Sequence, residues 1–394
     1  SNSVMTTRLM SASLDRDRIA HRRQVSIDYG ATATEVEELL VYNCNIFEYE
    51  LEWDNTPELH VAVWQEYLAE SSTIGVWESL RHRLVQLQFP IQKGISETEE
   101  YRATTRRGLP IPAGTVGFEL RSPQLLELSI HQSWAGPIPV IFTGDRADFE
   151  QLVRALLRRN EPVAIPAAMG ACMVAGFNNW DRIRRYRDRW ELEHGAESWD
   201  EEWRRLMPQK TLYQDRFILL SDSPYSNVAA SDLGLTENVW RRQSRQIRLE
   251  HESIHYWTKR RLGAMQNNVL DELMADYWGF VAATGDYQAD WFLCCLGLEA
   301  WPLYRASGRL SNYRGNPQLS AGAFEVLQSL VVAAARNLER VHFLISEQST
   351  GLESARWVVE ALSYLTLEEI ALPGAIDLLT NLVLDLKHKQ LMRI

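Results

Sequence analysis

Cysteine is scarce in this sequence, which has four in a chain of 394 residues: Cys44, Cys172, Cys294 and Cys295. None forms a Cys-x-x-Cys pair, and two adjacent cysteines cannot easily form a disulfide with each other. This spacing excludes a disulfide framework and a metal site built on paired thiolates. We therefore expect a reduced protein in the cytoplasm.

Long hydrophobic runs are also lacking. The longest stretch without a charged residue, Pro162 to Trp180, contains two prolines and two glycines and barely reaches the length of a membrane-spanning helix. The first residues lack the basic and then apolar pattern of a secretory signal peptide. We expect neither a membrane span nor export, in agreement with the cysteine content.

Positive charge is in deficit. The chain has 41 Lys and Arg against 52 Asp and Glu, which gives a formal net charge of −11 at pH 7. Binding to nucleic acid or to an anionic membrane depends on an excess of positive charge, so we expect neither partner. The hydrophobic content of 45% is that of an ordinary globular protein.

The hydrophobic pattern divides the chain into three predicted parts. Residues 1–112 form an N-terminal helical or mixed region, which ends in a polar segment rich in Gly, Pro and Thr. Residues 113–235 alternate between strand-like and helix-like spacing and form an α/β region. Residues 236–394 have almost purely helical spacing. The sequence therefore predicts an α+β protein.

The predicted elements follow from apolar periodicity and turn residues. Strands are predicted at residues 115–120, 125–130, 139–143, 162–165 and 217–220. One helix is predicted to begin after Gly144-Asp145, and another extends from residue 169 to 192. In the C-terminal part, helices are predicted at residues 236–262, 268–283, 320–346, 352–365 and 367–387, the last interrupted near Pro373-Gly374.

The predicted helix at residues 236–262 contains the pattern His-Glu-x-x-His. His251 and His255 are four residues apart and so lie on one face of the helix, where both imidazoles can reach a single ion. Glu252 lies one step around the helix, where its carboxylate can act as a base without being a ligand. A single rigid element thus supplies two ligands and a base.

Two acidic residues on the next predicted helix complete the pattern. Glu272 and Asp276 are again four residues apart, on a helix whose other positions are mostly apolar. Carboxylates in such a setting need partners. We expect Glu272 to be the third metal ligand, and Asp276 to accept a hydrogen bond from the outer nitrogen of a ligand histidine.

The segment from His251 to Asp276 resembles the gluzincin, or thermolysin-like, branch of the zinc metallopeptidases. Their signature is HExxH on one helix and ExxxD on the next. The resemblance covers about 26 residues and implies zinc as the cofactor, His251, His255 and Glu272 as its ligands, Glu252 as the general base and Asp276 as an outer acid. In that family an upstream strand pairs with extended substrate, and Phe217 to Leu220 occupies a comparable place in this sequence.

A second group of polar and aromatic residues follows at positions 299–315. Within it, Tyr304 and Arg305 are the candidates for stabilising an oxyanion and for holding a substrate carboxylate. The alternative is a structural loop whose arginines pair with the excess of acidic residues. The sequence leaves these two interpretations open.

The function predicted from these residues is zinc-dependent hydrolysis of a peptide or a small amide. Two alternatives remain. The first is a metalloenzyme that catalyses an elimination or cyclisation on a small molecule. The second is a protein without catalytic activity whose metal ion holds two helices together. The sequence does not indicate the oligomeric state.

Overall fold

The structure, a computed structural model, describes residues 16–43, 55–263, 268–348 and 352–392. Contacts divide the chain into two units. We call residues 52–227 and 235–253 the sheet unit, and residues 1–51, 228–234 and 254–394 the helical unit. This division differs from the three predicted parts, because segments distant in sequence belong to one unit.

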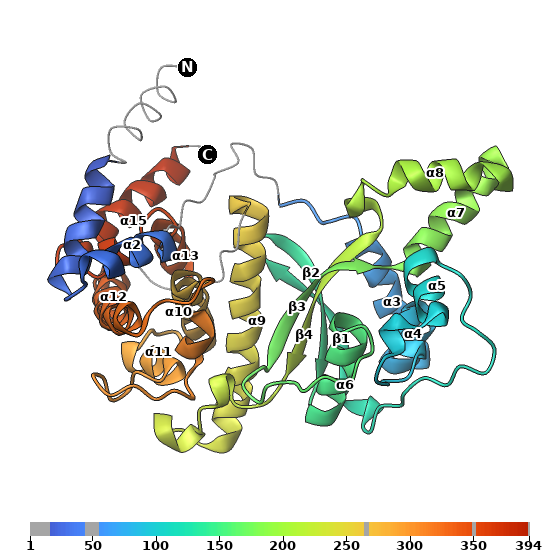
Figure 1. The fold of residues 1–394 in the computed structure, drawn as a ribbon, viewed down its shortest axis with the longest axis horizontal. Helices are drawn as coiled ribbons and strands as arrows, with labels where there is room; N and C mark the ends of the chain where they lie inside the picture. The colour runs from blue at the N-terminus through green and yellow to red at the C-terminus, as the bar shows by residue number, and fades with distance from the viewer. Residues whose placement is uncertain (1–15, 44–54, 264–267, 349–351, 393–394) are drawn as a thin grey trace. The chain divides into compact units, whose positions relative to one another are not determined.

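The sheet unit contains four strands (Figure 1): β1 (Leu126–Ser133), β2 (Gly136–Thr143), β3 (Ala171–Asn178) and β4 (Gln214–Ser221). Their order across the sheet is β1-β2-β4-β3. The β1–β2 and β3–β4 pairs are antiparallel, whereas β2 and β4 are parallel. The sheet is therefore mixed, and β1 and β3 are its edges.

The position of β4 corrects one prediction. Phe217 to Leu220 was expected to be a strand that could pair with substrate, but β4 has β2 on one side and β3 on the other. Its backbone N–H and C=O groups are hydrogen-bonded to these two neighbours, so no substrate strand can pair with them. Of the two edge strands, β3 is the nearer in sequence to the HExxH segment at residues 251–255.

Helices cover one face of this sheet. They are α3 (Val61–Ile74), α4 (Val76–Arg83) and α6 (Arg146–Leu157). Their apolar side chains form one buried core with alternate residues of the strands. Trp64 of α3 and Phe149 of α6 lie in this core together with Ile141 of β2 and with Phe217 and Leu219 of β4.

Residues 237–253 of α9 (Glu237–Leu262) belong to the sheet unit, and this part of the helix contacts two of its strands. The guanidinium of Arg245 lies 3.5 Å from the centre of the Phe142 ring of β2. Arg245 also forms an ion pair with Glu127 of β1, and His131 of β1 lies 3.3 Å from Glu250. These contacts fix the orientation of α9 against the sheet.

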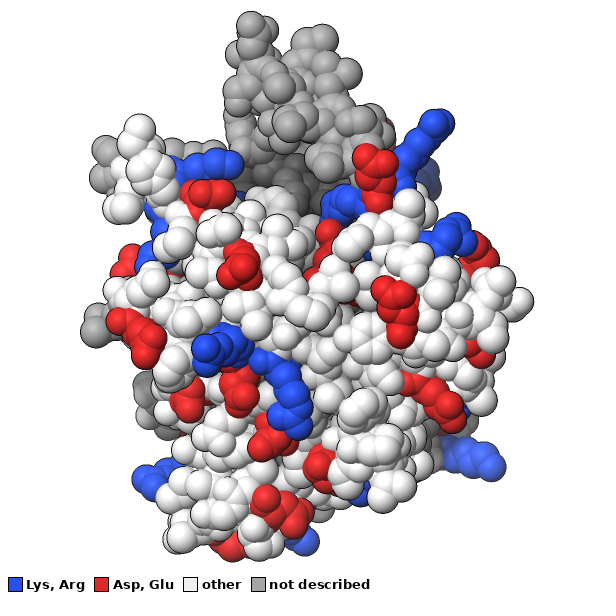
Figure 2. Space-filling model, turned by 90° about the vertical axis from the view of Figure 1, so that its left-hand side faces the viewer, with Lys and Arg blue, Asp and Glu red and all other residues white. Residues whose placement is uncertain are grey.

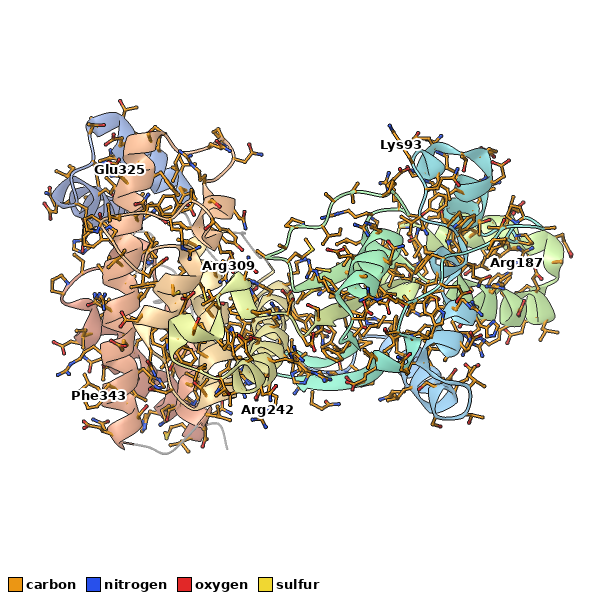
Figure 3. The ribbon with its side chains drawn as sticks, turned by 90° about the horizontal axis from the view of Figure 1, so that it is seen from below. Lys93, Arg187, Arg242, Arg309, Glu325 and Phe343 are labelled. Carbon is orange, nitrogen blue, oxygen red and sulfur yellow. The ribbon has the colours of Figure 1, made fainter. Side chains whose placement is uncertain are left out.

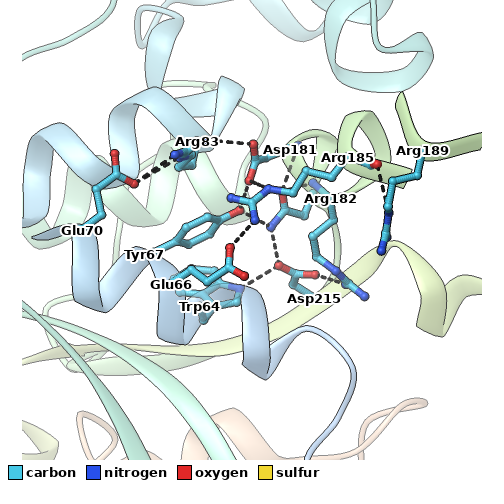
Figure 4. A network of polar contacts seen from close by, with 11 residues as sticks. Trp64, Glu66, Tyr67, Glu70, Arg83, Asp181, Arg182, Arg185, Arg189 and Asp215 are labelled. Atoms are coloured by element: carbon cyan, nitrogen blue, oxygen red, sulfur yellow. Dashed lines mark hydrogen bonds and ion pairs between the residues drawn. The ribbon is translucent and has the colours of Figure 1, made fainter. Parts of the chain in front are cut away.

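The remaining helices of the sheet unit are α5 (Glu99–Arg107), α7 (Trp180–His194) and α8 (Trp199–Leu206). A buried polar network joins α7 to α3 and β4 (Figure 4). Within it, Asp215 accepts hydrogen bonds of 2.7 Å from both Trp64 and Asn179 and pairs with Arg182. Tyr67 donates to Asp181 at 2.6 Å.

Three strand and helix predictions in this unit are wrong. Residues 115–120 and 162–165 form no strand, and residues 171–178 form β3 where a helix was predicted. The run at 162–165 lies between Pro162 and Pro166, which lack the amide hydrogen that a strand ladder needs. The helix predicted from residue 169 begins only at Trp180, because Asn179 caps it by accepting from the amides of Asp181 and Arg182.

The helical unit contains α2 (Ala33–Tyr42), α10 (Val269–Thr284), α11 (Ala289–Leu296), α12 (Ala321–Gln348), α13 (Leu352–Leu362), α14 (Leu367–Ile370) and α15 (Ala375–Leu391), together with the end of α9. Residues 16–28 are also helical. The long helix α12 packs against α2, α11, α13, α14 and α15. It is therefore the central helix of this unit.

Short 3₁₀ helices connect these elements. They span Val85–Gln88, Ile95–Glu97, Pro123–Leu125, Ala196–Ser198, Lys210–Leu212, Tyr225–Asn227, Ala230–Leu233 and Arg309–Tyr313. Two of them, Tyr225–Asn227 and Arg309–Tyr313, carry residues that contact the candidate site described below.

The predicted C-terminal helices and the α+β class are confirmed. Helix α9 begins after Thr236, whose hydroxyl accepts from the amide of Val239 at 3.4 Å, and it ends before Gly263, where φ is +69°. The break near Pro373-Gly374 separates α14 from α15. Among the described residues, no helix has both the length and the apolar character that crossing a membrane requires.

Charged side chains are dispersed over the face of the helical unit that Figure 2 presents. Acidic groups are scattered over this face, basic groups lie near its centre and around its margins, and wide uncharged areas separate them (Figure 2). The described residues of this face therefore show no large patch of one charge.

Candidate metal centre

Helix α9 brings His251 and His255 to one of its faces. The two residues are one turn apart, and both are buried, with 7% and 3% of their surface exposed. Glu252, between them in sequence, is half-buried. The helix continues without interruption for two turns beyond His255, so the relative positions of the two imidazoles are held by regular backbone hydrogen bonds.

Helix α10 supplies the carboxylates. Asn268 caps its N-terminus by accepting a hydrogen bond from the amide of Asp271, and Glu272 lies in the first turn. Every residue from Val269 to Val281 is buried, so Glu272 and Asp276 are enclosed by protein. Burying a carboxylate is costly unless a hydrogen-bond donor or a cation compensates for the lost water.

One atom from each of His251, His255 and Glu272 lies within 4.8 Å of the corresponding atoms of the other two. The Nε2 atom of His255 is 3.2 Å from Oε1 of Glu272. In a tetrahedral zinc site with ligand distances of about 2.0–2.1 Å, neighbouring ligand atoms are about 3.4 Å apart. The cluster therefore has the size and the donor atoms of a site for one metal ion.

A tyrosine orients the first histidine. The hydroxyl of Tyr225 lies 2.9 Å from Nδ1 of His251. The amide of Tyr225 donates to the Ser244 hydroxyl at 2.9 Å, and Arg248 donates to the carbonyl of Pro224 at 2.7 Å. The tyrosine is thus tied to α9 on both sides, and with Nδ1 in contact with its hydroxyl, Nε2 is the nitrogen of His251 that could bind a metal ion.

An arginine and a second tyrosine hold Glu272. The Nη2 atom of Arg309 lies 3.2 Å from Oε2 of Glu272 and also pairs with Asp276. Tyr313 forms a side-chain hydrogen bond with Glu272, and its pKa is raised mainly by burial and further by the negative charge of Glu272. Arg309 can be followed among the side chains in Figure 3.

The predicted partners of this cluster are placed as follows. Asp276, expected to accept from a histidine, accepts from Arg309, and its contact with a histidine stays a prediction. Arg305 donates to Glu299 at 2.5 Å and to the carbonyl of Cys294 at 2.7 Å. The ring of Tyr304 packs edge-on against Phe324 at 5.4 Å.

The loop at residues 299–315 therefore contacts the cluster through two members of the predicted polar and aromatic group other than its main candidates, Tyr304 and Arg305. Arg309 and Tyr313 reach Glu272, whereas the contacts of Arg305 and Tyr304 tie them to their own loop, to α11 and to α12. Helical spacing could not reveal this, because Arg309 and Tyr313 lie 25 and 29 residues beyond the end of α10 at Thr284.

Glu252 lies close enough to the edge strand β3 for its charge to act on Cys172. Burial raises the pKa of the Cys172 thiol to about 12, and Glu252 contributes to this rise. The thiol therefore stays protonated at neutral pH, which makes it a poor nucleophile.

The fold and the cluster together define an α+β protein with a buried His-His-Glu group that can hold a metal ion. The chain belongs to the family of unknown function DUF7005, whose family model matches residues 24–374. No curated protein and no solved structure matches the chain.

Proposed function

We propose that this protein is a zinc-dependent hydrolase that cleaves a peptide or a small amide, as a gluzincin-like enzyme would. The observation that carries the proposal is the convergence of His251, His255 and Glu272 within 4.8 Å. Two imidazoles and one carboxylate, with no thiolate, form a donor set typical of catalytic zinc sites, in which a further coordination position is left for water.

The surroundings of the cluster fit a metal ion. In His251, the outer nitrogen Nδ1 contacts the hydroxyl of Tyr225. In His255, Nε2 faces Glu272, where it could bind the same ion as the carboxylate. A hydrogen bond at the outer nitrogen of a ligand histidine is a recurrent feature of zinc sites, since it fixes the tautomer and the orientation of the ring.

The chemistry requires a base and a source of reactive water. A zinc ion bound at this site would act as a Lewis acid and lower the pKa of a water molecule towards about 7. Glu252, half-buried and adjacent to His251, would accept the proton of the attacking water and then deliver it to the leaving amine. Because Glu252 is not part of the metal-holding group, its carboxylate stays available for this transfer.

The strand β3 is the candidate for binding extended substrate. It is an edge of the sheet, and Glu252 lies near enough for its charge to act on Cys172 of this strand. A peptide could pair with residues 171–174, where the strand is regular, up to the irregularity between Val174 and Phe177. In this proposal β3 takes the place that sequence reasoning assigned to residues 217–220.

We also propose a reducing compartment, the cytoplasm, as the site of action. The three described cysteines, Cys172, Cys294 and Cys295, are not in disulfides. Free thiols persist where glutathione and thioredoxin keep the environment reducing.

The proposal is tested by measuring the metal content and the peptidase activity of the purified protein. We expect about one zinc ion per chain and hydrolysis of a mixture of unstructured peptides. A chelator should remove the zinc and abolish the hydrolysis. His255→Ala should abolish both, and His194→Ala, which changes an exposed histidine on α7, should leave both unchanged. Absence of bound metal in the unmutated protein after incubation with zinc would overturn the proposal.

A further inference from the structure

We propose that Arg309 is a positioning residue that restricts Glu272 to one ligand oxygen and thereby keeps the metal site open. This inference rests on the proposed metal site, but not on hydrolysis. It extends that site beyond its ligands to a residue 37 positions further along the chain than Glu272, in a different element.

The two oxygens of Glu272 face different partners. Oε1 is 3.2 Å from Nε2 of His255, whereas Oε2 is 3.2 Å from Nη2 of Arg309. A carboxylate can bind a metal through one oxygen or through both. With the guanidinium beside Oε2, only Oε1 is directed towards the histidine.

Charge favours the same arrangement. Glu272 and Asp276 are one turn apart on α10 and are almost completely buried, with 2% and 0% of their surface exposed. Two carboxylates so placed repel each other, and the same Nη2 of Arg309 is paired with both. Removing Arg309 would take away the cation beside Oε2 and leave Tyr313 as the donor to Glu272, so that the carboxylate could turn about its last side-chain bond and offer both oxygens.

The segment that carries Arg309 is itself held firmly. Leu310 is fully buried, and Tyr313 at the end of the same 3₁₀ helix forms a side-chain hydrogen bond with Glu272. The hydroxyl of Tyr42 donates to the carbonyl of Tyr313 at 2.6 Å. At the start of the segment, a Cβ on Gly308 would lie 2.3 Å from the carbonyl oxygen of Leu296, so the backbone of this loop packs directly on the end of α11.

The guanidinium is suited to this role in a way that an ammonium is not. The two N–H bonds of Nη2 are held at fixed angles in the plane of the guanidinium and can point to two carboxylates, whereas a lysine ammonium is a flexible point charge. A lysine at position 309 would retain the charge but lose the fixed geometry. This difference separates positioning from simple neutralisation of charge.

The test uses cobalt(II), whose visible absorption is intense in four-coordinate sites and weaker as the coordination number rises. We expect the unmutated full chain to give the intense spectrum. Arg309→Met should give a weaker spectrum, and its affinity for zinc, measured by competition with a chromogenic chelator, should fall about 10–100-fold. Arg309→Lys should give an intermediate spectrum. Tyr313→Phe, which removes the second donor to Glu272, should shift the spectrum in the same direction as Arg309→Met.

The matched control is Arg305→Met, in the same loop, because the contacts of Arg305 are with Glu299, Ser307 and Cys294. It should leave the spectrum and the affinity unchanged. If Arg309→Met does not fold, the cobalt spectrum of Arg309→Lys tests the inference in its place. Spectra identical to that of the unmutated protein in the folded Arg309 variants would overturn the inference.

The hydrolase proposal can fail separately. Cobalt binding without any peptide hydrolysis would overturn that proposal, while the spectra would still decide the role of Arg309. An unmutated protein that binds no cobalt would overturn both.

Discussion

The hydroxyl of Tyr225 lies 2.9 Å from Nδ1 of His251, and both residues are buried. This contact joins the 3₁₀ helix Tyr225–Asn227, which follows β4 closely in sequence, to the middle of α9. It fixes the imidazole ring so that Nε2, and not Nδ1, is the nitrogen that could bind a metal ion. The tyrosine therefore determines the geometry of the proposed site without being a ligand itself.

We expect Tyr225→Phe to weaken zinc binding about 10–100-fold, the usual effect of losing a hydrogen bond to a ligand histidine. Competition with a chelator measures the change. Tyr213→Phe is the control, because the hydroxyl of Tyr213 donates to the carbonyl of Met207 and belongs to a separate aromatic cluster. Equal affinities for Tyr225→Phe and the unmutated protein would show that His251 is oriented by other contacts.

Glu252→Gln tests the role of the proposed base. The amide cannot accept a proton from water, so peptide hydrolysis should fall by about 10²–10⁴-fold. Zinc content should not change, because Glu252 is not one of the three clustered residues. The control is Glu250→Gln, two residues earlier on α9, whose carboxylate lies 3.3 Å from His131. A variant at position 252 that loses its zinc together with its activity would contradict the assignment of Glu252 as base.

The sequence could predict the part of the site that lies within single helices. The spacing is four residues between His251 and His255 and again between Glu272 and Asp276. Helical periodicity alone places each pair on one face of its helix. The partners of these residues could not be predicted in this way. Tyr225 precedes His251 by 26 residues, and Arg309 is 37 residues after Glu272, so only the tertiary fold brings them together.

The same limit applies to the sheet. The hydrophobic run at residues 217–220 correctly predicts a strand, but a run of buried residues does not reveal whether its neighbours pair on one side or on both. β4 is central because β3, from an earlier segment, adds to its outer side. β3 itself was predicted to be helical, since its residues, Ala171 to Asn178, are small or apolar without strict alternation, with Gly176 at the irregular position.

The network around Asp215 makes a prediction about stability. Its carboxylate accepts from Trp64 and Asn179 at 2.7 Å and pairs with Arg182, and 1% of its surface is exposed (Figure 4). Asp215→Ala would leave the buried guanidinium of Arg182 without its main counter-charge, at a cost of about 3–5 kcal/mol in the free energy of unfolding. Chemical denaturation measures this cost.

The control for Asp215 comes from the same network. Glu66 pairs with Arg185, but 61% of its side chain is exposed, so water screens the pair (Figure 4). Glu66→Ala should cost about 1 kcal/mol or less. Similar losses for the two variants would mean that burial of the Asp215 cluster contributes no more to stability than a surface ion pair does.

His60 makes the stability of the protein depend on pH. Its Nε2 lies 2.7 Å from the carbonyl oxygen of Arg216. The pKa of His60 is lowered from 6.5, mainly by burial and also by the positive charge of Arg182, although Asp215 and Glu58 act in the opposite direction. The folded protein therefore binds fewer protons at this residue than the unfolded chain does at and below pH 6.5. Stability should be fully present above this pH and should decrease as the pH falls towards the lowered pKa.

Each pKa unit of lowering corresponds to about 1.4 kcal/mol of stability lost over this range. We expect His60→Gln, whose amide can still donate to the Arg216 carbonyl, to lose less stability than the unmutated protein when the pH is reduced from 7.5 to 5.5. Denaturation curves at the two values measure the difference. His194→Gln changes an exposed histidine and should keep the full pH dependence. His342, whose pKa is also lowered by burial, contributes to the pH dependence that His60→Gln retains. If His60→Gln and the unmutated protein lost equal stability, protonation of His60 would not be coupled to unfolding.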